Sequence, residues 1–545
     1  MSNMPSSQTI PALLEEQSLR FGDREAVVAG ATRLTYRALR HAVRRAAKGF
    51  VAIGVQRGNH VAILMGNRPE WIVTFLALQQ IGATAVGLNT WATPREMAFS
   101  LAHAEVDVLI AVDRFRKNDY RAMLDGMRPL TTGFPKLRKI VWLETESYDA
   151  GAQTIEMRWE QMLAMGDAVA DSAIDALGIA VQPDDVALLL YTSGSTAAPK
   201  GILLHHHHWI QNAWNIGERQ HVTHEDRLWL AVSLFWSFGS VNALPNLLSH
   251  GACIVLQEHF DAEEALALIE REHCSIMYGT PNMVLALKDH PSRASRNLTS
   301  LRSGAMIGTP EQLMMAVDLG AREICNVYGL SETYGNCAVT DAAEALAVRL
   351  QCVGQPLPGV TIHICHLETG APLAAGEVGE IRVQGPLFSA YYKDPQKTAE
   401  AYDANGFFHT GDLGMLDEAG RLYYRGRQKE MVKSGGINIA PIEVEETLMR
   451  HPAVRTAYVI GMPDPLLDEV LVAIVIAHEG KRPDLDELRR FCKQELAAYK
   501  VPTKFRLATD DELPLTTTGK VQKMMLHKLL APSTPPSPTT PTTPA

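Results

Sequence analysis

Apolar residues in this chain form short unbroken runs that are separated by stretches with helical spacing. The run VAILM at residues 61–65 is followed by PEWIVTFLALQQIG at 69–82, with a proline at the first helical position, and then by TAVGL at 84–88. The same order returns in ACIVL, DAEEALALIEREH and CSIMYG over residues 252–279. Short apolar runs are typical of strands buried on both faces, and the stretches between them predict helices. Repeats of this kind predict an α/β fold with parallel sheets.

The pattern changes near Arg425, where the Gly- and Lys-rich segment RGRQKEMVKSGGINIAPIEVEE begins. Mixed short strands and helices follow, which is typical of a small α+β domain. The last residues, APSTPPSPTTPTTPA, are Pro/Thr low complexity and cannot bury a core. We therefore expect a large N-terminal domain at 1–428, a small C-terminal domain at 429–530 and a disordered tail at 531–545.

Composition narrows the class of protein further. The 545 residues are 46% hydrophobic and 21% charged, as in ordinary globular enzymes. Lys and Arg number 51 against 61 Asp and Glu, so the net charge of −10 predicts no general attraction to nucleic acid or anionic membrane. The chain has no signal-peptide pattern and no run of about 18 apolar residues, so we expect a soluble, cytoplasmic protein without a membrane span.

Two clusters of metal-binding residue types occur. The first, His363-Ile364-Cys365-His366, lies in an alternating, strand-like segment without a second half-site, which argues against structural zinc. The second is HHHHW at 205–209. In a helix, four consecutive side chains spread around the axis instead of converging, which argues against a metal site here.

The segment YTSGSTAAPKG at 191–201 allows two interpretations. Gly, Ser, Thr and Pro are common in surface turns. Backbone N–H groups and hydroxyls in such a loop can also surround a phosphate, with Lys200 adding positive charge. The segment follows the apolar strand VALLLY, and parallel sheets bind ligands beyond the carboxyl ends of their strands. Its position favours the phosphate site, although it is no Walker A motif.

Three further segments follow in order: NVYGLSET at 326–333, HTGDLG at 409–414 with Arg427 behind it, and PLTTTGKVQK at 514–523. Together with YTSGSTAAPKG they resemble the motifs of the adenylate-forming (ANL) superfamily. This superfamily includes acyl-CoA synthetases, peptide-synthetase adenylation domains and firefly-type luciferases. The resemblance covers about residues 10 to 528, which is nearly the whole folded chain. Within it, His206 aligns with a histidine that is common in the family after the phosphate loop, so we expect His206 to pack at a helix start and its neighbours to be exposed.

The resemblance implies an ATP site and a role for each motif. Glu332 and Thr196 would bind Mg²⁺, and a carboxylate suits this hard cation. Lys520 would be the catalytic lysine, because a cation between the carboxylate and the α-phosphate lowers the barrier to their approach. By resemblance, Tyr328 would stack on adenine, and Asp412 and Arg427 would hold the ribose. The residues implied to bind ATP or AMP are Thr192, Ser193, Gly194, Ser195, Thr196, Lys200, Tyr328, Gly329, Ser331, Asp412 and Arg427.

The second half-reaction would use the small domain. By resemblance, Lys429 is the hinge about which this domain rotates after the adenylate forms, because a few residues suffice for such a movement. Gly435 and Gly436 would line the tunnel for CoA, where glycine permits close approach of the backbone. The same two glycines could also make a tight turn.

Four residues fall where the family holds the acyl group: Trp236, Phe238, Gly304 and Met306. Trp236 stands where relatives often have histidine, which weakens any polar contact carried over from them. No acidic residue stands where amino-acid adenylators hold the substrate ammonium. The pattern favours an apolar acid of medium-chain, alicyclic or aromatic type.

The sequence therefore predicts an ATP-dependent acyl-CoA ligase, a monomer or homodimer that uses ATP, Mg²⁺ and CoA on a small carboxylic acid. Three alternatives stay open at this point. The enzyme could load a separate carrier protein, or it could be a luciferase-type oxygenase. A non-catalytic nucleotide-binding regulator is the third, although the five charged residues of the motifs, Lys200, Glu332, Asp412, Arg427 and Lys520, favour an intact site.

Overall fold

The computed structural model describes residues 4–143, 155–192, 199–434, 437–464, 467–496, 498–515 and 521–530. The chain divides into two compact units. Unit 1 comprises Met1–Thr410 and Met415–Tyr424, and unit 2 comprises Gly411–Gly414 and Arg425–Ala545. Several predicted site residues lie outside the described residues, as does the tail at 531–545: Ser193, Gly194, Ser195, Thr196, Gly435, Gly436 and Lys520.

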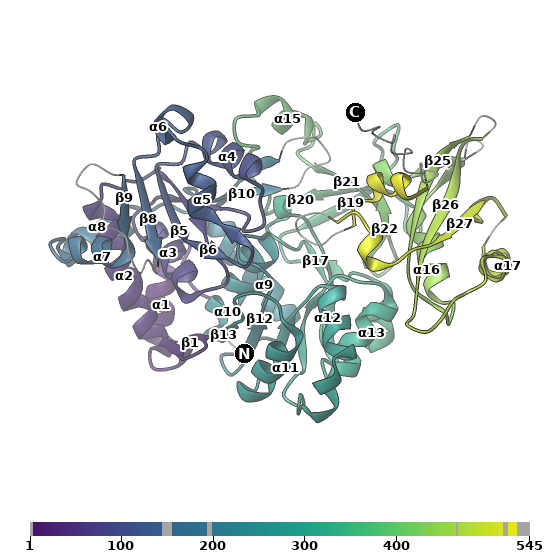
Figure 1. Cartoon of the computed structure of the whole chain (residues 1–545), viewed down its shortest axis with the longest axis horizontal. Helices are drawn as coiled ribbons and strands as arrows, with labels where there is room; N and C mark the ends of the chain where they lie inside the picture. The colour runs from purple at the N-terminus through teal and green to yellow at the C-terminus, as the bar shows by residue number, and fades with distance from the viewer. Residues whose placement is uncertain are drawn as a thin grey trace, which may run out of the picture. The chain divides into compact units, whose positions relative to one another are not determined.

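Unit 1 contains a seven-stranded sheet within the described residues (Figure 1). Neighbouring strands are parallel except at one edge, where β11 runs antiparallel to β10. The central strands β3 (His60–Leu64) and β4 (Thr84–Gly87) are largely apolar and buried, because helices such as α3 (Pro69–Gln80) pack against them. In spatial order the strands are β11 (Lys200–His205), β10 (Val186–Thr192), β4 (Thr84–Gly87), β3 (His60–Leu64), β5 (Val108–Val112), β8 (Lys139–Leu143) and β9 (Glu156–Arg158).

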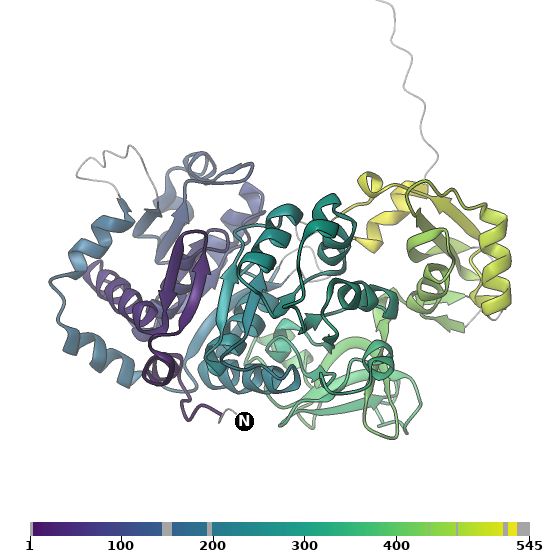
Figure 2. The same ribbon diagram turned by 90° about the horizontal axis from the view of Figure 1, so that it is seen from below.

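The second sheet of unit 1 has nine strands in the part of the chain that is described. Its central strands are parallel, and the β1–β2 hairpin, purple in Figure 2, forms one edge. The strands in order are β18 (Gln355–Pro356), β17 (Ala338–Val339), β16 (Glu323–Tyr328), β15 (Ser303–Met306), β14 (Ile276–Tyr278), β12 (Arg227–Leu230), β13 (Cys253–Leu256), β1 (Glu25–Ala29) and β2 (Thr32–Thr35).

The helices of this sheet begin where the sequence provides caps. Thr280 accepts a hydrogen bond from the Met283 N–H at the start of α12 (Pro281–Asp289). Thr309 and Gln312 form a capping box at the start of α13 (Pro310–Leu319). In both helices proline occupies the first turn, where its missing N–H costs nothing. The two helices pack against each other.

The predicted elements at 61–88 and 252–279 are confirmed as β3, α3 and β4, and as β13, α11 (Ala262–Arg271) and β14. The parallel α/β class is confirmed with them. A four-stranded sheet follows in the chain, and the division between the two units runs through its last two strands. Its strands are β19 (Thr361–Cys365), β20 (Gly379–Gln384), β21 (Phe408–Leu416) and β22 (Leu422–Arg427).

Unit 2 is a small α+β fold, as predicted. Alternate residues of its central strand β26 (Asp468–Ala477) face two cores. Leu471, Ala473 and Val475 belong to a core with α16 (Pro441–Met449) and α17 (Leu485–Glu495), whereas Ile474 and Ile476 pack against Leu526 and its neighbours. The other strands of this sheet are β23 (Val432–Ser434), β24 (Ile437–Ile439), β25 (Val454–Asp464) and β27 (Lys504–Leu507).

None of the helices formed by the described residues combines the length and the hydropathy that a membrane crossing requires.

Candidate active site

The predicted phosphate segment connects two antiparallel strands. β10 ends at Thr192, β11 begins at Lys200, and these two residues face each other in the register of the pair. Thr192 and Lys200 are therefore held at the two ends of the loop, at the carboxyl end of a strand that is parallel to β4. The loop residues between them, at 193–198, lie outside the described residues.

The NVYGLSET motif forms the end of β16 and the turn behind it. Gly329 can carry no side chain, because a Cβ atom there would lie 2.2 Å from the Gly335 carbonyl oxygen. The next residues, Ser331–Thr333, form one 3₁₀ turn, in which the Thr333 hydroxyl accepts a hydrogen bond from the Leu330 N–H at 2.9 Å. Glu332 is thereby fixed in the interior, with 9% of its surface exposed.

Tyr391 joins these two motifs. The Lys200 ammonium lies over its ring, 4.6 Å from the ring centroid, and its hydroxyl donates to Glu332 Oε1 at 3.2 Å. Burial raises the pKa of Tyr391, and the Glu332 carboxylate raises it further. The phenol therefore stays protonated at physiological pH and acts as a donor.

A second contact joins the acyl segment to the same motif. The Ser331 hydroxyl donates to Ser237 Oγ at 2.9 Å, although 94 residues separate the two. Ser237 lies between the two aromatic residues predicted to contact the substrate. The structure thus brings Lys200, Glu332, Ser331 and the SLFWSFGS segment at 233–240 into one connected group.

The predicted acyl residues lie in aromatic surroundings. The Trp236 ring meets the edge of Trp91 at 5.1 Å between centroids, and Phe238 stacks on Tyr278 at 4.9 Å. Met306 is buried at the end of β15. Gly304 has a structural reason to be glycine: its φ is +145°, and a Cβ atom would lie 1.9 Å from the Met277 carbonyl oxygen of the neighbouring strand.

Tyr328, predicted to stack on adenine, is 6% exposed at the end of β16. Its ring lies 5.8 Å from that of Tyr424, at an interplanar angle of 31°. Both belong to a small apolar cluster that also contains Ile381 and Leu422. The structure thus places this ring within a packed cluster.

Asp412 and Arg427, the predicted ribose pair, lie next to each other in unit 2. Asp412 is buried on β21, and Arg427 Nε at the end of β22 lies 3.3 Å from its Oδ1. A buried carboxylate beside a guanidinium is an acceptor-only group, which suits it to the hydroxyl donors of a sugar. The exposed Lys429 follows in a short turn, Gln428–Glu430.

The histidine run behaves only partly as expected. His206 begins α9 (His206–Arg219), is buried, and accepts from the Ile10 N–H, and burial lowers its pKa to about 3. The prediction of exposed neighbours is wrong, because His205, His207 and His208 are half-buried. His205 and His207 contact the carbonyl oxygens of residues 184 and 183, and His208 packs against Tyr334.

Within the described residues, no group of three or more His, Cys, Asp or Glu side chains is placed to hold a metal ion. Glu332 nevertheless fits the predicted role at Mg²⁺. A carboxylate offers about four lone-pair sites, so the hydrogen bond from Tyr391 is compatible with binding a cation. Nucleotide phosphates and water commonly supply the remaining ligands of Mg²⁺.

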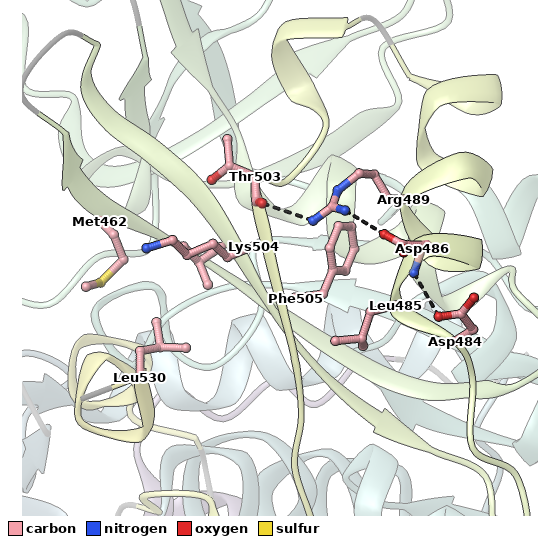
Figure 3. Close-up of a pocket in the computed structure, with 10 residues that line it drawn as sticks. Met462, Asp484, Leu485, Asp486, Arg489, Thr503, Lys504, Phe505 and Leu530 are labelled. Carbon is pink, nitrogen blue, oxygen red and sulfur yellow. Dashed lines mark hydrogen bonds and ion pairs between the residues drawn. The ribbon is translucent and has the colours of Figure 1, made fainter. Parts of the chain in front are cut away.

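Unit 2 has a surface pocket of about 610 Å³, shown in Figure 3. Apolar residues such as Leu485 and Phe505 line it together with charged ones. The charged groups bind one another: Arg489 donates to Asp486 at 2.8 Å and to the Thr503 carbonyl at 3.2 Å. None of the predicted site residues lines this pocket.

Sequence reasoning missed Tyr391, Ser237 and Trp91. Tyr391 lies 59 residues from Glu332, and no spacing rule connects the two. The nearest local signal is the aromatic pair in AYYKDP at 390–395, which follows a glycine-containing turn. That pair alone does not indicate which charges it contacts.

The chain matches the family model of the AMP-binding enzyme over residues 14–392 and that of the AMP-binding enzyme C-terminal domain over residues 443–520. It therefore belongs to the AMP-binding enzyme family, the adenylate-forming superfamily that the motifs indicated. The predicted class, an AMP-forming acyl-CoA ligase, is confirmed by the relatives described next.

The acyl-CoA ligase SID4 of Ajellomyces capsulatus is 33% identical, over 96% of this chain and 91% of its own. A second relative, from Mycobacterium tuberculosis, is also 33% identical, over 96% of this chain and 99% of its own. It is named 3-[(3aS,4S,7aS)-7a-methyl-1,5-dioxo-octahydro-1H-inden-4-yl]propanoyl:CoA ligase. Among solved structures, ATP-bound MatB from Rhodopseudomonas palustris superposes with a TM-score of 0.79 at 25% identity, covering 96% of this chain and 99% of its own.

Proposed function

We propose that this acyl-CoA ligase activates an apolar carboxylic acid that carries a ring or a medium-length chain. A carboxylate oxygen attacks the α-phosphorus of ATP, and the bond to pyrophosphate breaks, which gives acyl-AMP. The CoA thiol then loses its proton and attacks the acyl carbonyl, and AMP leaves with the bonding electrons. The products are acyl-CoA, AMP and pyrophosphate.

The observation that carries this proposal is the connected group in unit 1. Lys200 and Glu332 meet at Tyr391, and Ser331 binds Ser237 of the acyl segment. A cation, a carboxylate for a metal ion, a hydroxyl and an apolar wall are the groups that acid activation by ATP requires. Within the described chain they come from three separate segments, and Tyr391 of a fourth connects two of them.

We assign each group one task. Lys200 would donate to phosphate oxygens, and Ser331 would donate to the α-phosphate, where charge shifts as the adenylate forms. Asp412 and Arg427 would hold the ribose hydroxyls. Tyr328 and Gly329 would border the adenine. Lys520 would lie between the two reacting anions.

Mg²⁺ bound at Glu332 would neutralise charge on the leaving pyrophosphate. The hydroxyls of Thr192, Ser193, Ser195 and Thr196 and the N–H of Gly194 would donate to the phosphates. These loop residues match the family motif.

The acid class follows from the aromatic surroundings of Trp236 and Phe238. The faces and edges of these rings favour flat or cyclic carbon skeletons, because aromatic pairs add stabilisation beyond the area that they bury. The relative from Mycobacterium tuberculosis is named for a propanoate on a fused bicyclic ring, which supports an alicyclic acid here as well.

For the thiol step we propose that the small domain, residues 429–530, pivots at Lys429 on the large domain at 1–428. Gly435 and Gly436 would then let the pantetheine arm of CoA pass close to the backbone. Gly304 and Met306 would border the acyl group.

The test measures acid-dependent pyrophosphate release from MgATP across straight-chain, alicyclic, aromatic and amino acids, each with and without CoA. We expect one apolar class to give turnover that rises with CoA. Release that does not depend on CoA would indicate a carrier-loading enzyme. Release with amino acids only would contradict the apolar pocket.

A further inference from the structure

Tyr391 contacts two groups of opposite charge through two different parts of its side chain. Its ring face lies under the Lys200 ammonium, and its hydroxyl binds the Glu332 carboxylate. A cation over a tyrosine ring is attracted by the ring quadrupole, and the attraction grows when water is excluded. Tyr391 is 7% exposed, so this contact is well shielded.

The backbone holds Tyr391 in this place from both sides. The Tyr392 N–H donates to the Gly201 carbonyl at 2.8 Å, directly beside Lys200. The Phe388 N–H donates to the Glu332 carbonyl at 2.8 Å. The segment 388–392 is thus hydrogen-bonded to the backbone at both charged motifs.

Side chains of two neighbouring residues hold Tyr391 as well. The Thr398 hydroxyl accepts from the Tyr391 N–H at 3.0 Å, and the Phe388 ring packs against the Tyr391 ring at 4.7 Å between centroids. A ring held on several sides keeps one orientation, and its hydroxyl then has one direction in which to donate.

We propose that Tyr391 is a positioning residue that keeps Lys200 and Glu332 from neutralising each other, so that the lysine serves phosphate and the carboxylate serves the metal ion. A lysine and a glutamate that contact the same side chain attract each other. The neutral Tyr391 side chain contacts both of them, Lys200 at its ring face and Glu332 at its hydroxyl.

This inference rests on the proposed function, because it deepens the account of the same site. It assigns a role to a residue outside the four motifs. It also explains why a tyrosine suits this position better than phenylalanine, which would retain the ring but lose the donor to Glu332.

The test compares Tyr391→Phe with Tyr402→Phe. Tyr402 is a matched control, because its hydroxyl donates to the Phe388 carbonyl in the same segment instead of to a charged side chain. We expect Tyr391→Phe to raise the Mg²⁺ concentration for half-maximal adenylation about tenfold, the usual effect of losing one hydrogen bond to a charged group. The KM for the acid should stay within about twofold. Tyr402→Phe should leave both unchanged.

Calorimetry of ATP binding without acid gives a second measurement that needs no turnover. In the wild type, we expect ATP to bind more tightly with Mg²⁺ than without it, and in Tyr391→Phe this gain should shrink about tenfold. Thermal unfolding of each variant checks that the fold is intact. An unchanged Mg²⁺ dependence in Tyr391→Phe, or an equal shift in Tyr402→Phe, would overturn the proposal.

The two proposals can fail separately. If the wild type releases no pyrophosphate with any acid, the proposed function fails, and the calorimetry still decides the role of Tyr391. If the wild type is active and Tyr391→Phe shows normal Mg²⁺ dependence, only the role of Tyr391 fails.

Discussion

Two lysines of this protein, Lys200 in unit 1 and Lys523 in unit 2, meet their surroundings in opposite ways. Lys523 lies 2.8 Å from Glu445 and 3.3 Å from Glu430, so two carboxylates neutralise it. Lys200 lies over the ring of Tyr391, and the carboxylate beyond that ring is held by a phenol hydroxyl. One lysine is part of an ion-paired network, and the other contacts an aromatic face.

The difference teaches how a fold separates structural charges from functional ones. A charge that is paired in place stabilises its own unit, and removing its partner leaves a buried charge uncompensated. A charge held by an aromatic ring keeps its capacity to bind an anion. Each of the following substitutions tests one side of this comparison.

Lys200→Met should have the largest effect. The loss of a charge-assisted contact to phosphate should lower kcat/KM for ATP about a hundredfold, or about 3 kcal/mol. The free energy of unfolding should change by less than about 1 kcal/mol, because a methionine side chain can still pack against the Tyr391 ring. Pyrophosphate release and urea unfolding measure the two quantities. A large loss of stability with normal turnover would show that Lys200 is a structural charge, as Lys523 is.

Lys523→Met should have its main effect on stability. The free energy of unfolding of unit 2 should fall by about 2 kcal/mol, because Glu445 is 7% exposed and would be left without its cation. Burial raises the pKa of Glu445, and Lys523 opposes that rise. Without Lys523 the folded state takes up a proton more readily than the unfolded chain, so its stability increases as the pH falls.

The loss of stability caused by Lys523→Met should therefore be largest at pH 8 and should become smaller toward pH 5. Chemical unfolding at several pH values measures it. The double variant Lys523→Met with Glu445→Gln is the control, and it should lose this pH dependence. A deficit that is equal at both pH values would contradict the role of Glu445.

Glu332→Gln sharpens the comparison within unit 1. The amide oxygen can still accept from Tyr391, so stability should change by less than about 0.5 kcal/mol, while the lost charge should raise the Mg²⁺ requirement roughly tenfold. Adenylation rates at graded Mg²⁺ concentrations test this, and an unchanged requirement would remove Glu332 from the metal site.

Asp486→Asn should have the smallest effect. Its ion pair with Arg489 lies at the surface, where the Asp486 side chain is 77% exposed, and such pairs contribute less than about 0.5 kcal/mol. Unfolding at low and high salt measures the change. A loss above about 1 kcal/mol would show that the pocket of Figure 3 depends on this pair.

Much of the fold is readable in the local pattern. The apolar runs at 61–65 and 252–256 form β3 and β13, and the helical stretch at 69–82 forms α3. These elements can be predicted because the buried faces of a strand or a helix set the spacing of its apolar residues along the sequence. The helix start at His206, expected from the resemblance, is confirmed as the start of α9. The burial of its neighbours escaped prediction, since it depends on residues 183 and 184 and on Tyr334, which come from other segments.

The sequence by itself determined the class of this protein, because its motifs are contiguous and each places a few functional groups on one loop or turn. Only the tertiary structure decided how those groups are used. Tyr391 reaches Lys200 and Glu332, and Ser237 reaches Ser331, through contacts made when strands and loops far apart in the chain pack together. The physical reason is that a charge acts on its neighbours in space, at a few ångströms, and sequence separation does not enter that energy.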